Sequence, residues 1–400
     1  MADKHDNDIV LASPVRTPIG RFGGALASLS AADLGTAAAQ ACLSRAGLDP
    51  AKVDQVIFGH ARQAGGGPNT ARQIAFRAGV PVERPAYTVN QACGSGLQAV
   101  LSAARTILTG EAEVVLAGGT ESMSNTPYFL PRARWGYRMG NAEVVDGMYK
   151  DGFNDPLSEL VMGETAEELA LECGIDRGAS DSWAVESQNR SERARARGRF
   201  ESEIAPVKVA GKKGETVVDR DEHPRDGVTL ASLEKLDPVF RKDGGRVTAG
   251  NASGITDGAA SIVVASRRAA AELGLPVVAR LVGWEVVGVE PRIMGIGPVP
   301  AVRKLLQKTG LPISAIDEVE LNEAFACQVL ACLKSLDFDP ARVNPDGGAI
   351  SLGHPIGATG ARILVTLLHG MEARNLERGI ATLCVSGGLG LAALVEREAA

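Results

Sequence analysis

Aromatic side chains are scarce in this sequence, at 4% of 400 residues. The core must therefore be built mainly from aliphatic side chains. The sequence also lacks any apolar run of about 18 residues, the length that indicates a membrane-spanning helix. Its first nine residues lack the basic start and the apolar stretch of a secretory signal. We therefore predict a cytoplasmic protein with no membrane partner.

An excess of basic residues is missing as well. Lysine and arginine together number 42, and aspartate and glutamate 48, which gives a net charge of −6. Because nucleic-acid-binding proteins usually present a positive surface, we expect no nucleic-acid partner. None of the six cysteines forms a CxxC motif, and Cys327 and Cys332 would stand about 140° apart on a helix. We therefore expect reduced thiols and no metal site.

Glycine, in contrast, is abundant, at 47 residues of 400. The first third of the chain alternates short aliphatic segments with longer amphipathic ones. Strands are predicted at residues 9–11, 53–59, 87–90 and 114–117, the last closed by two glycines. Helices are predicted between them, the first with Asp33 as its N-cap and Gly47 after its end. This alternation predicts an α/β fold with parallel sheets covered on both faces.

The middle of the chain has a different character. Residues 122–251 contain several prolines, the aromatic residues Trp135, Tyr137 and Tyr149, and a charged helical stretch at 180–200. We therefore predict an inserted loop domain. The strand and helix pattern then resumes, with strands predicted at 259–265, 277–284, 319–321, 349–351 and 380–384. The predicted domains are an N-terminal half (1–121 with about 252–274), the loop domain (122–251) and a C-terminal half (275–400).

The two halves resemble each other where a strand meets a helix. In the first half, residues 93–96 (CGSG) open a helix at 97–108, and in the second, residues 351–357 (SLGHPIG) open a helix at 358–368. This match predicts an internal duplication, with Cys93 and His354 at equivalent junctions.

Cys93 occupies a position that suits a nucleophile. Unpaired N–H groups and the helix dipole should lower its pKa, and Gly94 and Gly96 leave room for a carbonyl group. The alternatives are a small buried thiol, or a nicotinamide site. Residues 94–99 fit the GxGxxA dinucleotide fingerprint, with Glu121 after the next strand.

Three further residues are candidates for the same chemistry. His354 is framed by a glycine and a proline that suits a first helical turn, although a lone histidine is more often structural. Cys384 precedes a glycine-rich loop and could move a proton at a carbon acid, or it is simply a buried side chain. Asn322 ends another predicted strand, where it could fix a water molecule or cap a helix.

At these residues the sequence resembles the thiolase family along nearly its whole length. The matching segments are 90–96 (NQACGSG), 322–326 (NEAFA), 353–358 (GHPIGA) and Cys384 with its glycine loop, together with 16–20 (RTPIG) and 249–254 (AGNASG). The resemblance implies two similar βαβαβ-type halves in a layered α/β/α/β/α core. It also implies that the inserted loop domain covers coenzyme A.

The resemblance assigns roles to the candidate residues. Cys93 would be the nucleophile that accepts the acyl group, His354 the base that activates it, and Cys384 the acid and base at the α-carbon of the second substrate. One oxyanion hole would consist of His354 and a water held by Asn322. The backbone amides of Cys93 and Ser386 would form the other.

The resemblance also implies where coenzyme A thioesters bind. The implied substrate-binding residues are Arg225 and Ser232 near the nucleotide, Ser253 at the pantetheine arm, and Met162, Met294 and Phe325. The resemblance implies no metal and no further cofactor. It implies a homodimer or homotetramer in which residues 123–139 are a candidate contact.

Two positions depart from the family pattern, since Val161 stands where short-chain members usually carry histidine, and Ser386 replaces a glycine. Met162 and Met294 match the short-chain pattern. We therefore expect an acetyl-CoA C-acetyltransferase that interconverts two acetyl-CoA with acetoacetyl-CoA and free coenzyme A. The alternatives are a degradative 3-ketoacyl-CoA thiolase for longer chains, an inactive acyl-CoA-binding homologue, and a Cys–His hydrolase that would have no use for Cys384.

A run of arginines in the loop domain is a separate feature. It comprises Arg190, Arg193, Arg195, Arg197 and Arg199. We expect a solvated helix face, with attraction of the coenzyme phosphates as the alternative.

Overall fold

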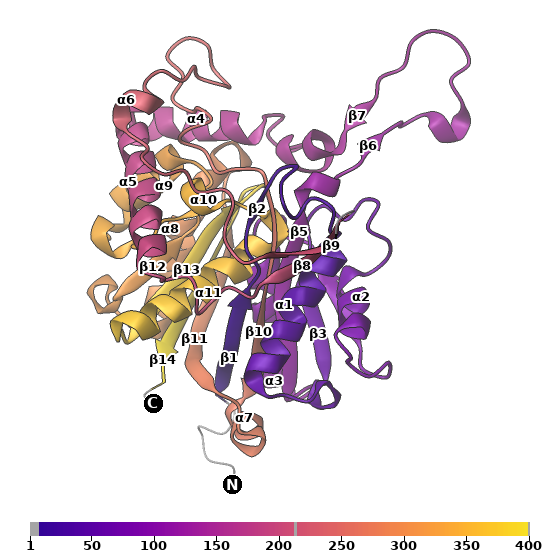
Figure 1. Ribbon diagram of the computed structural model, residues 1–400. Coiled ribbons are helices and arrows are strands. Elements are labelled where there is room, and N and C mark those ends of the chain that lie inside the picture. Colours follow the sequence, from indigo (N-terminus) through magenta and orange to yellow (C-terminus); the bar gives the residue numbers. More distant parts are fainter. Residues whose placement is uncertain (1–7, 212–213, 399–400) are drawn as a thin grey trace.

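Ten strands of the described residues form one sheet in the computed structural model, which describes residues 8–211 and 214–398 (Figure 1). The predictions about residues 1–7 therefore lie outside the description. The strand order is β12-β13-β14-β11-β1-β10-β5-β3-β4, and β2 pairs with β10. The strands are β1 (Ile9–Arg16), β2 (Gly20–Arg21), β3 (Gln55–Gly59), β4 (Ala86–Val89), β5 (Val114–Ser122), β10 (Thr256–Ser266), β11 (Val277–Gly288), β12 (Glu318–Leu321), β13 (Arg378–Val385) and β14 (Leu389–Arg397).

Each half of this sheet forms one β layer, and three layers of helices enclose the two halves. The central layer consists of α3 (Ser95–Leu108) and α11 (Ile356–Arg374), whose apolar side chains share one core with strands from both halves. On the outer faces, α1 (Ala31–Ala46) and α2 (Thr70–Arg77) pack on the N-terminal half, while α8 (Pro298–Thr309) and α9 (Ala326–Leu336) pack on the C-terminal half. The layer order is therefore the expected α/β/α/β/α.

The two halves of the sheet have corresponding strand orders. Counted outward from the central β1–β11 pair, one half runs β1-β10-β5-β3-β4 and the other β11-β14-β13-β12. The pairs β3–β5 and β12–β13 are parallel, whereas β5–β10 and β13–β14 are antiparallel. This correspondence supports the predicted internal duplication.

The predicted strand at 349–351 is wrong. These residues form the short helix α10 (Ala349–Leu352). The backbone N–H of Ile350 donates to the buried Glu323 carboxylate instead of to a neighbouring strand, at 3.1 Å. In so short an apolar segment, the spacing of apolar residues does not distinguish a helix from a strand. The sequence pattern therefore could not reveal the helix.

Two predicted boundaries also need correction. The N-cap of α1 is Ser30, and Asp33 is the third helical residue, whose carboxylate accepts from the Ser30 backbone N–H in a capping box. Strand β5 does not end at residues 118–119 but continues to Ser122. A side chain at Gly119 would come within 2.3 Å of the Gly357 carbonyl, so the glycine permits close packing against α11.

The segment between β5 and β10 divides into an arm and a cap. The arm, with β6 (Tyr128–Phe129) and β7 (Val145–Asp146), projects from the body, and a π-helical turn (Tyr149–Phe153) follows it (Figure 1). The cap contains α4 (Met162–Cys173), α5 (Arg177–Ala196), the β8–β9 hairpin (Val207–Gly211, Gly214–Val218) and α6 (Leu230–Leu233). Helix α5 packs on α9 and α10, so this part of the cap lies over the C-terminal half, whereas the β8–β9 hairpin packs on α1 of the N-terminal half. No helix of the described residues is long and apolar enough to cross a membrane.

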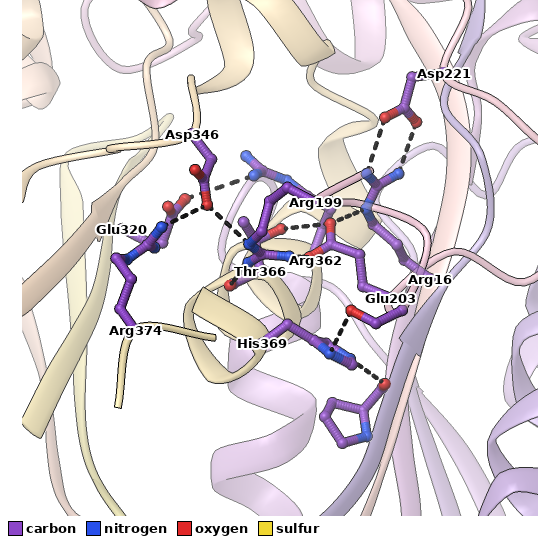
Figure 2. Close-up of polar contacts among 12 residues, drawn as sticks. Arg16, Arg199, Glu203, Asp221, Glu320, Asp346, Arg362, Thr366, His369 and Arg374 are labelled. Carbon is purple, nitrogen blue, oxygen red and sulfur yellow. Dashed lines mark hydrogen bonds and ion pairs between the residues drawn. The ribbon is translucent and has the colours of Figure 1, made fainter. Parts of the chain in front are cut away.

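A buried ion network anchors the chain after α5 to the core (Figure 2). Glu203 accepts from Arg16 at 2.6 Å and from Arg199 at 3.1 Å. Asp346 in turn pairs with Arg199 at 2.9 Å and with Arg374 of α11 at 3.0 Å. Because a buried charge is costly unless it is paired, this network specifies one arrangement of cap and core.

The predicted solvated arginine face is therefore wrong at Arg199, which is 8% exposed and part of the network. The other arginines of the run also pair with carboxylates rather than standing free. They are Arg190 and Arg193 with Glu186, Arg195 with Asp226, and Arg197 with Asp346.

Candidate active site

Cys93, His354, Cys384 and Ser386 line one pocket between the two halves of the fold. Cys93 stands just before α3 and His354 just before α11, while Cys384 lies in β13 and Ser386 follows that strand. These elements lie far apart in the sequence but meet across the central layer. The structure thus brings together the residues that sequence motifs singled out separately.

The turn before α3 presents Cys93. Ala92 has a φ of +44°, a conformation that costs energy in a residue with a side chain. The Ser95 hydroxyl stabilises the turn because it accepts from the Gln91 N–H at 2.9 Å and donates to the Ala92 carbonyl at 2.7 Å. Such held strain indicates that the backbone fixes the position of the thiol.

The Cys93 thiol is protonated in the resting pocket. Burial raises its pKa, while the Arg62 charge and the Ser386 backbone N–H act in the opposite direction without overcoming it. The prediction that the helix start lowers this pKa is therefore wrong, because the surrounding segments withdraw the thiol from water. Cys93 needs a base to become a thiolate.

His354 can supply that base. It follows Gly353, whose φ of +105° few other residues could adopt. Its Nδ1 lies 2.6 Å from Oγ1 of Thr359, and that hydroxyl donates its single proton to the Pro355 carbonyl at 2.9 Å. The hydroxyl can therefore only accept from the imidazole, so Nδ1 carries the proton and Nε2 is left as the basic nitrogen.

The charge state of His354 fits this role. Burial lowers its pKa to about 3, and the nearby charges of Arg362 and Arg62 act in the same direction. The imidazole is therefore neutral at physiological pH, which leaves Nε2 without a proton. Pro355 is the N-cap of α11 rather than a residue of its first turn.

Cys384 is only 2% exposed and stands in an apolar wall with Met294, Ala324 and Phe325. Burial raises its pKa well above the usual value, and the neighbouring Cys93 adds to the shift. Cys384 is therefore a neutral thiol at rest, able to give a proton to a developing anion beside it.

Asn322 is buried just outside the pocket lining, and neither atom of its side-chain amide has a protein partner. Buried polar groups nearly always have a hydrogen-bond partner, so this amide indicates a bound water or a substrate oxygen. The alternative that Asn322 caps a helix is wrong, since the N-cap of α9 is Phe325.

Glu323, which the sequence analysis did not assign, stabilises the loop that carries Asn322. Its fully buried carboxylate accepts from Trp183 and Asn344, both at 3.0 Å. It also accepts from the Ser187 hydroxyl at 2.7 Å and from the Ile350 backbone. The cap and the C-terminal half thus converge on this carboxylate.

Glu121 has a similar anchoring role on the other side of the pocket. Its buried carboxylate lies 3.1 Å from His60 Nε2 and accepts from the Gly357 N–H at the start of α11, at 2.9 Å. A side chain at Gly96 would come within 2.7 Å of the Ala361 nitrogen. The dinucleotide alternative is therefore wrong, because α11 fills the space that a pyrophosphate would need and Glu121 is already engaged.

The predicted substrate-binding residues fall into two groups. Ser253, Met162, Met294 and Phe325 line the pocket together with Val161. Arg225 and Ser232 do not line it and lie exposed on the cap, where Ser232 completes the capping box of α6. Within residues 8–211 and 214–398, no group of three His, Cys, Asp or Glu side chains is placed to hold a metal ion.

Comparison with known proteins agrees with this site. The family model of the thiolase N-terminal domain matches residues 9–268, and that of the thiolase C-terminal domain matches residues 275–397. The chain belongs to the thiolase family. The resemblance drawn from the sequence motifs is thereby confirmed.

Individual members of the thiolase family are similar over their whole length. The acetyl-CoA acetyltransferase of Pseudomonas aeruginosa is 50% identical over 392 residues, which cover 98% of this chain and 100% of that protein. The crystal structure of the Bacillus anthracis acetyl-CoA acetyltransferase has a TM-score of 0.96 at 45% identity, covering 99% and 100% of the two chains. That of human mitochondrial 3-ketoacyl-CoA thiolase has a TM-score of 0.95 at 42% identity, covering 98% and 100%. The predicted thiolase fold is therefore confirmed.

Proposed function

We propose that this member of the thiolase family is an acetyl-CoA acetyltransferase, an acyltransferase that interconverts two acetyl-CoA with acetoacetyl-CoA and free coenzyme A. The observation that carries the proposal is the pocket in which the Cys93 thiol, the neutral His354 and the Cys384 thiol converge. The full-length similarity to acetyl-CoA acetyltransferases supports it.

In the first half-reaction, Nε2 of His354 accepts the Cys93 proton and the thiolate attacks the acetyl-CoA carbonyl. Backbone N–H groups of Cys93 and Ser386 stabilise the resulting oxyanion. The thioester bond then breaks, the acetyl group stays on Cys93, and Cys384 gives its proton to the departing coenzyme A thiolate.

In the second half-reaction, the Cys384 thiolate removes a proton from the α-carbon of a second acetyl-CoA. The enolate oxygen is stabilised by the protonated Nε2 of His354 and by a water held on Asn322. The enolate carbon attacks acetyl-Cys93, forming the new carbon–carbon bond. The Cys93 thiolate leaves and takes back its proton from His354, so all three groups return to their resting protonation states.

The coenzyme would enter beneath the inserted loop domain, residues 122–251. The position of Ser253 in the pocket lining suits contact with the pantetheine arm, and Arg225 and Ser232 on the exposed cap surface suit the nucleotide end. With coenzyme A thioesters as substrates, this reaction uses no metal and no further cofactor. The two halves, 1–121 with about 252–274 and 275–400, would each contribute one side of the site.

The arm supports the proposal of a homodimer or homotetramer. Trp135 and Met139, at its tip, are 83% and 98% exposed, and Leu130 is half exposed. Apolar side chains gathered at such exposure are typical of an interaction surface. We also propose that the enzyme is cytoplasmic and that it acts in fatty-acid metabolism.

A degradative 3-ketoacyl-CoA thiolase remains the second candidate, favoured by the similarity to the human enzyme. Two measurements test the proposal. Acetoacetyl-CoA supplied without free coenzyme A should leave an acetyl group on the peptide containing Cys93, detected by mass spectrometry. Thiolysis rates for 3-ketoacyl-CoA substrates of four to ten carbons should then be highest for the shortest chain. An unmodified Cys93 in active protein, or a clear preference for long chains, would reject the assignment.

A further inference from the structure

Arg62 is a charged residue of the pocket that the thiolase chemistry above does not use. It lines the pocket with Cys93, yet only 6% of its surface is exposed. Its Nε and Nη2 atoms are buried and have no hydrogen-bond partner. Among the described residues, no carboxylate forms an ion pair with its guanidinium.

The residues around Arg62 leave space for its guanidinium but provide no hydrogen-bond acceptor for its Nε and Nη2 atoms. Its central carbon lies 5.0 Å from the centroid of the Phe153 ring, so an aromatic face supports the guanidinium plane. A side chain at Gly152 would come within 1.9 Å of Nη2, and the glycine therefore leaves space for the group. Stacking on a ring engages the face of the guanidinium, so the Nε and Nη2 N–H groups, which point outward in its plane, still lack an acceptor.

The nearest anchored carboxylate is occupied by other donors. Glu121 accepts the Arg62 backbone N–H at 3.2 Å, and also bonds to His60 and Gly357. The Arg62 charge helps to lower the pKa of Glu121, but the carboxylate forms no hydrogen bond or ion pair with the Arg62 guanidinium. A buried cation is costly unless it is paired, so a partner that arrives with the substrate would relieve this cost.

We propose that Arg62 binds a carboxylate at the far end of the acyl group carried by Cys93, so that the enzyme accepts 3-oxoacyl-CoA substrates whose chains end in a carboxylate. A carboxylate matches the guanidinium edge with two parallel hydrogen bonds. An acetyl group has no acceptor at its end. This proposal rests on the proposed function, and it extends the substrate class of the same pocket.

The thiolysis of such a substrate uses the groups already described. The Cys93 thiolate attacks the 3-oxo carbon after its proton moves to His354, and the bond between C2 and C3 breaks. Cys384 protonates C2, which releases acetyl-CoA. The acyl group with its terminal carboxylate remains on Cys93 and passes to coenzyme A, whose thiol proton returns to Cys384, while His354 reprotonates Cys93. The carboxylate near Arg62 takes no part in bond breaking.

The test compares each acid with the methyl ester of the same chain, for substrates with two, three and four methylene groups between the ketone and the terminal carboxylate. In the unmodified enzyme, the kcat/KM of the acid should exceed that of the ester at one of these lengths. Arg62→Met should lower the acid-to-ester ratio by about 10- to 100-fold, the effect of losing a hydrogen-bonded charge. Arg62→Lys keeps the charge but cannot form two parallel hydrogen bonds, so its acid-to-ester ratio should lie between those of the unmodified enzyme and Arg62→Met.

Arg225→Met is the matched control, because any effect at the nucleotide end is common to acid and ester and leaves their ratio unchanged. A second readout needs no turnover. In Cys93→Ala, the shortened dicarboxylic acyl-CoA should bind more tightly than its methyl ester, and the added Arg62→Met change should abolish the difference.

An acid-to-ester ratio at or below one for all three chains, or a ratio that Arg62→Met leaves unchanged, would overturn the proposal. If Arg62→Met does not fold, the ratios in the unmodified enzyme and in Arg62→Lys still decide it. Failure of the proposed function is distinguishable, because it would abolish acetoacetyl-CoA thiolysis and acylation of Cys93 as well.

Discussion

Thr359 Oγ1 lies 2.6 Å from Nδ1 of His354 and donates its own proton to the Pro355 carbonyl. This relationship fixes which imidazole nitrogen carries the proton. Nε2 is thereby kept basic towards Cys93 at rest, and after proton transfer it can donate to a substrate oxygen. In the proposed mechanism Thr359 therefore acts through His354, as a positioning residue one turn along the helix.

Replacing Thr359 with valine should lower kcat for acetoacetyl-CoA thiolysis by about 10- to 100-fold, as expected for losing one buried hydrogen bond at the reacting group. KM should change little, because the hydroxyl does not contact the coenzyme. Thr359→Ser keeps the hydroxyl and should restore most of the rate. A purely structural role would not separate these variants, so equal rates for valine and serine would contradict the assignment.

The protonation of Cys384 leads to a second prediction. Burial raises its pKa well above the usual value, which suits the role proposed for it as proton donor and acceptor at the α-carbon. Cys384→Ala should lose condensation by about 100- to 10,000-fold, the usual contribution of a positioned acid or base. Transfer of acetyl from acetyl-CoA to Cys93 should persist, because a coenzyme A thiolate is a good leaving group.

The two half-reactions can be measured separately in Cys384→Ala. Exchange of labelled coenzyme A into acetyl-CoA reports acylation of Cys93, and acetoacetyl-CoA formation reports condensation. Cys327→Ala is a control, since Cys327 is buried in α9 outside the pocket lining. Equal loss of exchange and condensation in Cys384→Ala would remove its special role.

The ion network of Figure 2 makes stability depend on pH. Burial alone would raise the pKa of Glu203, but the charges of Arg16 and Arg199 outweigh burial and lower it from 4.5 to about 2. The folded state therefore binds this proton less readily than the unfolded state. The stabilising contribution is fully present above the unfolded pKa and is lost as pH falls from about 5 towards 2.

Glu203→Gln should therefore lower the free energy of unfolding by about 3 to 5 kcal/mol at pH 7, because it leaves Arg16 and Arg199 buried with reduced compensation. The difference from the unmodified protein should shrink as pH falls below 5. Urea unfolding at pH 7, 5 and 4 measures this. Glu272→Gln, in an exposed pair with Arg268, should leave the free energy of unfolding nearly unchanged at every pH. A difference for Glu203→Gln that does not vary with pH would contradict the linkage.

The convergence of the three candidate side chains in one pocket was predictable from the sequence because each has a local signature. Cys93 and His354 stand beside glycines where a strand meets a helix, and Cys384 precedes a glycine loop. The layered fold was predictable for a similar reason, since the aliphatic strands and the helices between them are local patterns.

The supporting residues were not predictable, because their roles depend on distant partners. Glu323 is bonded by groups from α5, α10 and the loop before α10, and Arg62 matters only because Gly152 and Phe153 surround it. The same limit explains the wrong prediction for Cys93, whose pKa follows burial by several segments rather than the local helix dipole. The side-chain pairing of Arg199 likewise required contacts with Asp346, 147 positions away along the chain.

The contact between α3 and α11 provides the last prediction. A side chain at Gly96 would lie 2.7 Å from the Ala361 nitrogen and 3.0 Å from the Gly357 carbonyl, both backbone atoms that can yield only if the helices move apart. Gly96→Ala should therefore destabilise the fold by about 1 to 3 kcal/mol, the usual cost of overpacking. Gly178→Ala, in the exposed first turn of α5, should be neutral or stabilising.

Gly96→Ala should also slow catalysis, because α3 and α11 carry Cys93 and His354 at their N-terminal ends. A displacement of about 1 Å between reacting groups can cost about 100-fold in rate. We therefore expect kcat to fall by 10-fold or more, at a temperature where thermal unfolding shows the variant fully folded. Folded Gly96→Ala with unchanged kcat would mean that the contact between the two helices does not set the distance between thiol and imidazole.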